Sequence, residues 1–146
     1  MEVRILGPLE VGADGGAVAV SGAKLRALLA VLAVHANRPV STERLALAVW
    51  GEDAPPGTMK AVKVHVSRLR RALGDSDVLE TTPAGYRLVV GPDELDAERF
   101  ERAVAAGRAA LAAGDAPRAS ELLRGALDLW RGAPLEEFAW APFAPP

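Results

Sequence analysis

The sequence predicts an α+β protein of two units: strands and helices up to about residue 90, then helices alone. Two observations predict this class. Segments of alternating polarity flank three helical patterns in the first unit, whereas the second shows only helical spacing. The formal charge is +2 over residues 1–90 and −4 over residues 91–146, within a total of −2. Opposite charges indicate different partners, and we place the domains at 1–92 and 93–146.

The composition limits the class of protein. The chain has 146 residues, of which 50% are hydrophobic and 25% charged, as in an ordinary globular protein. The absence of cysteine excludes a disulfide framework, a thiolate metal site and a cysteine nucleophile. No apolar run is long enough to span a bilayer, and "MEVRILG" has no export signal, so we expect no membrane partner and a cytoplasmic location.

The N-terminal unit opens with a small antiparallel meander. Apolar and polar residues alternate over Met1–Ile5 and Leu9–Val11, and "GADGG" at 12–16 is a turn before a third short strand at Val18–Val20. Helical spacing follows over 24–36, with a buried stripe of Leu25, Leu28, Leu29 and Leu32.

A second, short helix is predicted over 42–50. Pro39 ends the preceding helix, Ser41 lies where an N-cap belongs, and Gly51 ends the new helix. Residues 51–57, "GEDAPPG", form a loop because adjacent prolines cannot lie inside a helix.

Residues 58–73 predict a third helix rather than a strand. Valines alternate at 62, 64 and 66, but Val62, Val66, Leu69 and Leu73 fall at i, i+4, i+7 and i+11, a single helical stripe. Thr58 suits the N-cap and Gly74 the end. The opposite face carries Lys60, Lys63, Val64, Ser67, Arg68, Arg70 and Arg71, and His65 lies at the border of this face.

Two strands, 78–82 and 86–90, follow and are joined by "PAG" as a tight hairpin. Strands, three helices and a hairpin in this order predict a winged helix-turn-helix with an N-terminal antiparallel sheet and a C-terminal hairpin wing. The helix over 58–73 then enters the DNA major groove. Its cations suit phosphate and guanine, and Val64 suits a thymine methyl group.

A simpler interpretation of the same helix remains open. Basic residues in a last turn complement the helix dipole, and a charged face is often only solvated. Lys60 and Lys63 weaken this alternative, because the dipole disfavours cations in the first half of a helix.

The C-terminal unit predicts an all-α helical hairpin similar to one tetratricopeptide repeat. Asp96 caps a helix over 97–113, Pro117 opens another over 117–131, and apolar residues face inward: Phe100, Val104, Leu111, Ala119, Leu122, Leu123, Ala126, Leu127 and Trp130. One repeat cannot bury its own apolar face. The aromatics of "FAWAPFAPP" therefore either fold back onto the rest or mark part of a longer protein, the interpretation we favour.

No catalytic or cofactor pattern accompanies these elements. His35 and His65 lack metal-ligand spacing, and "GADGG" lacks the lysine of a nucleotide-binding loop. No paired carboxylates or catalytic triad can be argued. We therefore expect no enzyme activity and no cofactor.

The motifs resemble a known family. "VKVHVSRLRRALG" followed by "TTPAGYRLVV" is similar to the recognition helix and wing of OmpR/PhoB-type domains. "ILGPLEV", "LRALLAVLAVHANRPVSTERLALAVWGEDAP" and "SRLRRALG" resemble the Streptomyces antibiotic regulatory protein (SARP, AfsR-like) activators. "ALDLWRGAPLEEF" resembles the start of their bacterial transcriptional activation domain.

The resemblance implies an activator of secondary-metabolite (antibiotic) gene clusters. Such a protein binds promoter direct repeats as a head-to-tail dimer and recruits RNA polymerase with its sigma factor. A repressor on the same fold, or a protein-interaction module working through the acidic helices, are the alternatives.

The resemblance also assigns site residues. It places at the DNA Lys60, Lys63, Val64, His65, Ser67, Arg68 and Arg70, and in the wing Thr81, Thr82, Tyr86 and Arg87. The family more often has arginine at the position of Thr82, so we expect a phosphate contact there rather than minor-groove reading. The polymerase-facing loop is Gly51, Glu52, Asp53, Ala54, Pro55, Pro56 and Gly57.

Overall fold

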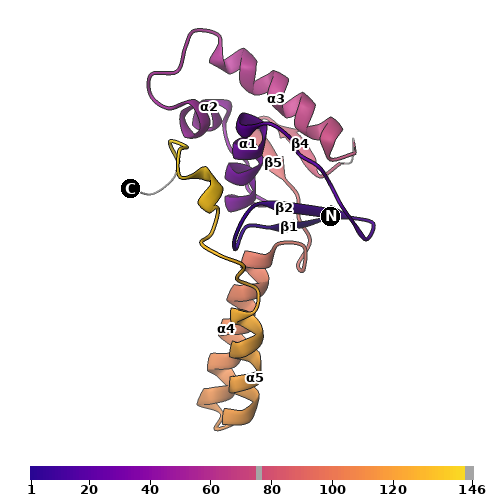
Figure 1. Ribbon diagram of the computed structural model, residues 1–146, viewed down its shortest axis with the longest axis vertical. Helices are drawn as coiled ribbons and strands as arrows, with labels where there is room; N and C mark the ends of the chain where they lie inside the picture. The colour runs from indigo at the N-terminus through magenta and orange to yellow at the C-terminus, as the bar shows by residue number, and fades with distance from the viewer. Residues whose placement is uncertain (75–76, 144–146) are drawn as a thin grey trace.

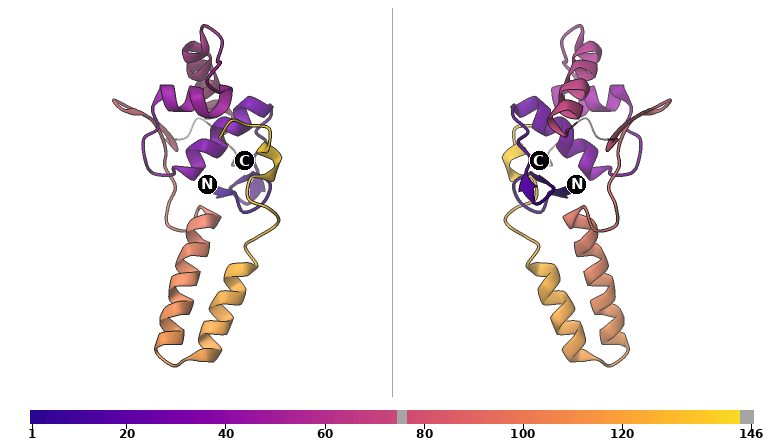
Figure 2. Two further views of the ribbon diagram at one scale, coloured as in Figure 1. Left: turned by 90° about the vertical axis from the view of Figure 1, so that its left-hand side faces the viewer. Right: turned by 90° about the vertical axis from the view of Figure 1, so that its right-hand side faces the viewer.

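The computed structural model describes residues 1–74 and 77–143 and has the α+β class that the sequence predicts. A winged-helix body carries two antiparallel helices that project from one end (Figures 1 and 2). The elements in chain order are β1 (Glu2–Arg4), β2 (Glu10–Ala13), β3 (Gly16–Ala17), α1 (Ala23–Val34), α2 (Thr42–Trp50), α3 (Thr58–Ala72), β4 (Leu79–Thr82), β5 (Gly85–Leu88), α4 (Asp96–Ala112), α5 (Ala116–Leu127) and the 3₁₀ turn η1 (Glu136–Phe138).

The N-terminal sheet has the order β1–β2–β3, all antiparallel, with Val3 opposite Val11. The third strand was predicted in the wrong place: β3 is Gly16–Ala17, and Val18–Val20 do not lie in a strand. Asp14 and Gly15 both have positive φ, 50° and 78°, which closes a two-residue hairpin turn and pairs Ala13 with Gly16.

Helix α1 is the centre of the core. Every residue from Ala27 to Ala33 is buried, whereas Leu25 of the predicted stripe is only half-buried. A helix that is buried on all sides has neighbours on all sides, and α1 packs against α2, α3 and β5. The stripe prediction was too narrow because spacing alone does not show how many elements surround a helix.

Helix α3 confirms the helical reading of residues 58–73. Val62, Val66 and Leu69 are at most 1% exposed and form the buried stripe. The predicted N-cap was wrong: Gly57, in the left-handed conformation, occupies that position. The Thr58 hydroxyl instead donates to the Pro55 carbonyl inside the preceding turn.

The wing is formed by β4 and β5, whose register pairs Thr82 with Gly85. Gly85, predicted to lie in the turn, begins β5. The main chain of Tyr86 exchanges two hydrogen bonds with Val40, of 2.8 and 2.9 Å, so the wing is fixed to the segment before α2. Only glycine fits here, because a Cβ at position 85 would lie 2.1 Å from the Val40 carbonyl oxygen.

The helical hairpin is fixed to the N-terminal sheet by Asp96. This residue was predicted to cap α4 from outside, but it is the first residue of the helix, and Leu95 is the N-cap. The Asp96 carboxylate is 1% exposed and accepts hydrogen bonds from the main-chain N–H groups of Ile5 (2.8 Å) and Leu6 (3.0 Å). A distant pair of donors therefore outcompetes the local capping role.

The helical hairpin is less buried than predicted. Ala119 and Ala126 are buried between α4 and α5, but Leu111 and Leu127 are 60% and 66% exposed. Helix α5 ends at Leu127 rather than 131, and Asp115 caps it by accepting from the Arg118 N–H. Two helices have only one mutual interface, so apolar residues beyond it face solvent.

The chain after α5 folds back onto the winged-helix body. We call residues 131–143 the C-terminal strap. Its main chain bonds to the loop after β1, from Arg131 N to Leu6 O (2.8 Å) and from Leu135 N to Gly7 O (3.0 Å). Phe138 is 2% exposed within the core that α1 centres. Phe138 and Phe143 thus pack on the core of the winged-helix body, while Trp140 is 48% exposed.

Candidate nucleic-acid interface

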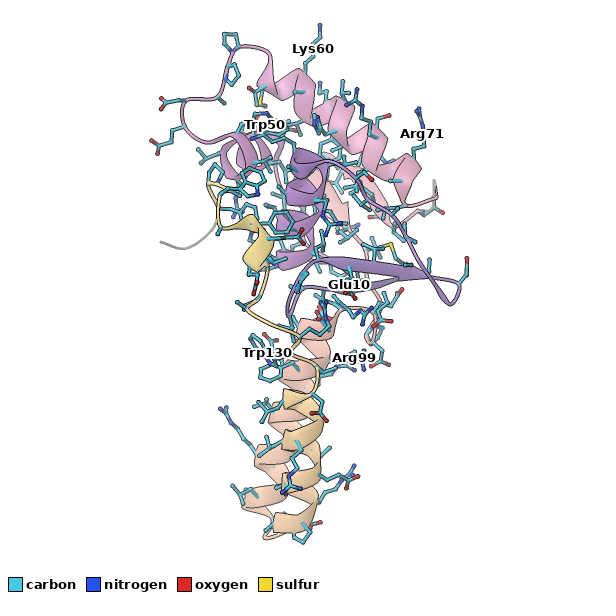
Figure 3. The ribbon with its side chains drawn as sticks, viewed as in Figure 1. Glu10, Trp50, Lys60, Arg71, Arg99 and Trp130 are labelled. Atoms are coloured by element: carbon cyan, nitrogen blue, oxygen red, sulfur yellow. The ribbon has the colours of Figure 1, made fainter. Side chains whose placement is uncertain are left out.

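The outward face of α3 is a positively charged surface of the winged-helix body. Figure 3 shows Lys60 and Arg71 near opposite ends of α3, both pointing away from the rest of the chain. The surface, which we call the α3 face, consists of exposed residues: Lys60, Lys63, Val64, Ser67, Arg68 and Arg71. Val64 is 47% exposed, far from the buried stripe of the same helix. The structure thus brings six of the sequence-predicted residues onto one side.

The cations of the α3 face are not neutralised within the described chain. Across residues 1–74 and 77–143, neither lysine forms an ion pair, and neither do Arg68 and Arg71. The first turn of α3 contains no acidic residue to offset its own dipole. Positive charge near a helix N-terminus is unfavourable by itself, so this face suits an external anion.

Arg70 differs from its neighbours. Its Nε donates to the Leu79 carbonyl (2.9 Å) and its Nη2 to the Thr81 hydroxyl (2.5 Å). The side chain is half-buried and ties α3 to β4. The structure therefore gives Arg70 a role in holding the wing beside the helix, which the residue pattern did not indicate.

His65 points sideways from α3 rather than outward. Its Nδ1 lies 2.8 Å from the Ala61 carbonyl oxygen, which only accepts, so Nδ1 carries the proton. The ring makes an edge-to-face contact with Trp50 at the end of α2, with centroids 5.2 Å apart. His65 thus joins α3 to α2.

In the wing, the side chains are largely engaged. Tyr86 is buried, and its ring is not presented to a ligand, because the alternation of β5 turns Tyr86 and Leu88 inward. Arg87 lies on the outer side, where it pairs with Glu80 across the hairpin. Thr81 is exposed and accepts from Arg70.

Thr82 closes the wing turn. Its hydroxyl donates to the Gly85 carbonyl and accepts from the Ala84 N–H, both at 3.2 Å. The exposed tip is then Pro83 and Ala84. Figure 2 shows the wing projecting sideways from the body. Its tip presents Pro83 and Ala84, not the four predicted side chains, and the Ala84 N–H already donates to Thr82.

Two further cations, Arg38 and Arg44, lie near the wing, and the sequence analysis did not predict them as site residues. Burial lowers the pKa of His35, and the positive charges of Arg44 and Arg38 lower it further. Arg38 and Arg44 flank Ser41, whose hydroxyl caps α2, in the segment that the Val40–Tyr86 bridge joins to the wing. The sequence could have indicated Arg44 as a site residue, because it lies in the first turn of the predicted helix α2, where the helix dipole disfavours a cation.

The loop between α2 and α3 is the remaining predicted site. Glu52, Asp53, Pro55, Pro56 and Gly57 are exposed, while Gly51 and Ala54 are half-buried. The loop extends from the side of the body away from the helical hairpin (Figure 1). It is accessible to a partner that also lies near α3.

Within the described residues, no three His, Asp or Glu side chains gather as a metal site requires. None of the helices in residues 1–74 and 77–143 combines the length and the hydropathy that spanning a bilayer requires.

A helix pair that exposes a cationic second helix, with a β-hairpin fixed beside it, defines the OmpR/PhoB-type winged-helix class. Residues 17–88 match the family model described as "Transcriptional regulatory protein, C terminal". Residues 95–145 match the bacterial transcriptional activator domain. The chain belongs to the SARP/AfsR-like family of transcriptional regulators, which combine these two domains.

Relatives along the whole chain agree with this assignment. The chain is 37% identical to the transcriptional regulatory protein EmbR of Mycobacterium tuberculosis over 100% of its length and 39% of that protein. It is 35% identical to the transcriptional regulator RedD of Streptomyces coelicolor over 92% of its length and 40% of RedD. It is 34% identical to the regulatory protein DnrI of Streptomyces peucetius over 90% of its length and 52% of DnrI.

A solved structure shares the fold. Mycobacterium tuberculosis EmbR, determined in complex with a low-affinity phosphopeptide, superposes with a TM-score of 0.92 and 37% identity. The match covers 97% of this chain and 39% of that chain. The chain thus spans about two fifths to half of the length of these relatives.

Proposed function

We propose that this chain is the DNA-binding part of a sequence-specific transcriptional activator and that α3 reads the major groove. The uncompensated cations of the α3 face carry the proposal. Phosphate neutralisation supplies most affinity for DNA, and cations with no internal partner are free for it. Lys63 and Arg68 suit guanine acceptors, and Val64 suits a thymine methyl group.

The surroundings of α3 supply positioning contacts in this proposal. Arg38 and Arg44, exposed beside the wing, are placed for phosphates at the edge of the groove. Tyr86 is not part of the proposed contact surface because its ring is buried. Arg70, His65 and Arg87 act through the elements they hold in place.

The finer features of the proposed function follow from the family resemblance. They are direct repeats bound by head-to-tail pairs, RNA polymerase and sigma factor contacted by residues 51–57, and secondary-metabolite gene clusters as targets. We also propose that the DNA-binding domain ends near residue 92. The exposed carboxylates and prolines of the loop support its use as a contact surface.

The test is selection of binding sites from random DNA, followed by footprinting of matching promoters. Lys63→Ala should weaken specific binding by about 1–3 kcal/mol and relax preference at one position. Arg71→Ala should weaken binding to all DNA sequences alike and reduce the slope of log affinity against log salt by about 1. Arg124→Ala, at an exposed site on α5, is the control. Unchanged affinity in both test variants would remove α3 from the interface.

A second candidate is a protein-interaction module that works through the helical hairpin. The exposed Leu111 and Leu127 favour it. The double variant Leu111→Ser and Leu127→Ser leaves specific DNA binding intact if the α3 face is the working part. Transcription from a footprinted promoter, with and without the protein, separates an activator from a repressor.

A further inference from the structure

A row of side chains connects the C-terminal strap to α3. The Lys24 Nζ, at the start of α1, lies 5.1 Å from the ring centroid of Trp140 in the strap and 5.5 Å from that of Trp50 in α2. Trp50 then meets His65 of α3 edge to face, with the rings 89° apart. Trp50, the last residue of α2, lies below α3 (Figure 3). Four residues from four segments therefore form one continuous contact.

Lys24 is held in this row by aromatic and main-chain groups. Its Nζ donates to the Val49 carbonyl (3.1 Å) near the C-terminus of α2, where the helix dipole favours a cation. It forms no ion pair with any described residue. A cation near two indole rings is attracted by both, so Lys24 draws Trp140 and Trp50 together.

The strap end of the row has its own anchors. The guanidinium of Arg26 bonds the Glu137 carboxylate at 2.8 and 3.2 Å, and the Leu9 N–H donates to the same carboxylate at 2.7 Å. Phe138 is buried, with its ring 6.5 Å from that of Trp140. Pro142 lies against Gly51, where a Cβ would be 3.4 Å from its Cγ. Trp140 is thus presented to Lys24 by a fixed segment.

We propose that Trp140 and Lys24 are positioning residues for α3, acting through Trp50 and His65. The row sets the angle between α2 and α3, and so the presentation of the α3 face. It makes DNA reading depend on the strap, which lies within the match to the activator domain, outside the matched DNA-binding domain. The inference rests on the proposed function for its effect on DNA, but not for the contact with His65.

The experiment uses the full chain with two independent variants. Trp140→Leu keeps apolar volume and removes the ring, and Lys24→Met keeps the stem and removes the charge. Trp140→Phe and Lys24→Arg restore a ring and a cation. Trp130→Leu is the matched control, because the Trp130 ring meets Phe100 of α4 edge to face, with centroids 5.3 Å apart, away from α3.

The first readout needs no DNA. The ring protons of His65 lie in the ring-current field of Trp50, so their NMR shifts report the angle between the two rings. Trp140→Leu and Lys24→Met should both move these resonances, the conservative variants should return them toward wild type, and Trp130→Leu should leave them in place. Resonances unchanged in both test variants would overturn the proposal.

The second readout is the ratio of specific to non-specific DNA affinity. Each test variant should lower it by about two- to fivefold, the size of a partly exposed cation–π contact. A ratio equal to wild type while the His65 resonances move would overturn the claim that the row positions DNA reading. Failure of the wild-type chain to bind any sequence would contradict the proposed function instead, and the NMR result would still decide the contact.

Discussion

The outer surface of α3 and that of the helical hairpin are both exposed, charged and helical, yet they differ in how their charge is compensated. Of the five arginines in α4 and α5, three pair with carboxylates: Arg118 with Glu121 (3.1 Å), Arg102 with Asp93 (2.8 Å) and Arg99 with Glu2 (3.5 Å). The other two, Arg108 and Arg124, form no ion pair with a described residue. The four cations of the α3 face have no such partner among the described residues. Cations that pair with carboxylates on the same surface attract an external anion only weakly. A surface whose cations have no such partner attracts a polyanion. Exposure alone does not separate the two.

Charge reversal tests this comparison most strongly. Lys60→Glu with Lys63→Glu should lower specific DNA affinity by about 100-fold or more, because two attractive phosphate or base contacts become repulsive. The matched pair Arg108→Glu with Arg124→Glu, on the exposed hairpin surface, should change it little. Fluorescence anisotropy at fixed salt measures both. Equal losses in the two pairs would mean that overall charge, not the α3 face, drives binding.

Removal of the tether between α3 and the wing should have an intermediate effect. Arg70→Ala loses the bonds to Leu79 and Thr81 and should cost about 1–2 kcal/mol of folding stability. Arg118→Ala removes a solvent-exposed ion pair and should cost about 0–1 kcal/mol. Urea denaturation of both variants gives the difference. A smaller cost at Arg70 than at Arg118 would contradict the structural role.

The smallest expected effect concerns acid stability of the strap. Burial raises the pKa of Glu137, but its bonds with Arg26 and the Leu9 N–H outweigh this and hold it below its usual value. A carboxylate with a lowered folded pKa stabilises the fold above its unfolded pKa, about 4.3, and loses that contribution as pH falls through the folded pKa.

Glu137→Gln should therefore have a lower melting temperature than wild type at pH 7. The difference in melting temperature should shrink once the pH falls below about 4. Glu121→Gln, in an exposed pair on α5, is the control and should show little difference at either pH. A gap for Glu137→Gln that stays constant from pH 7 to pH 3 would show that the charge is not involved.

Most elements were predictable because their causes are local. The spacing of Val62, Val66 and Leu69 fixes which side of α3 is buried, and therefore which side Lys63 and Arg71 occupy. Capping was less predictable. Asp96 and Thr58 have side chains suited to a cap, but each found a different partner, the N–H groups of Ile5 and Leu6 for one and the Pro55 carbonyl for the other.

The candidate site divides in the same way. The exposed cations of α3 follow from periodicity, while the altered roles of Arg70 and Tyr86 depend on where the wing lies. Their partners Leu79 and Val40 come from other segments, and sequence spacing does not show which segments meet.

By itself, the sequence determined the helices, the inward and outward faces of α3 and the concentration of positive charge there, because a 3.6-residue period acts over neighbouring residues. Only the tertiary structure decided which charges remain free and that the strap reaches Trp50 and His65 through Lys24. Those outcomes depend on contacts between residues as distant as Lys24 and Trp140, which meet only when the chain has folded.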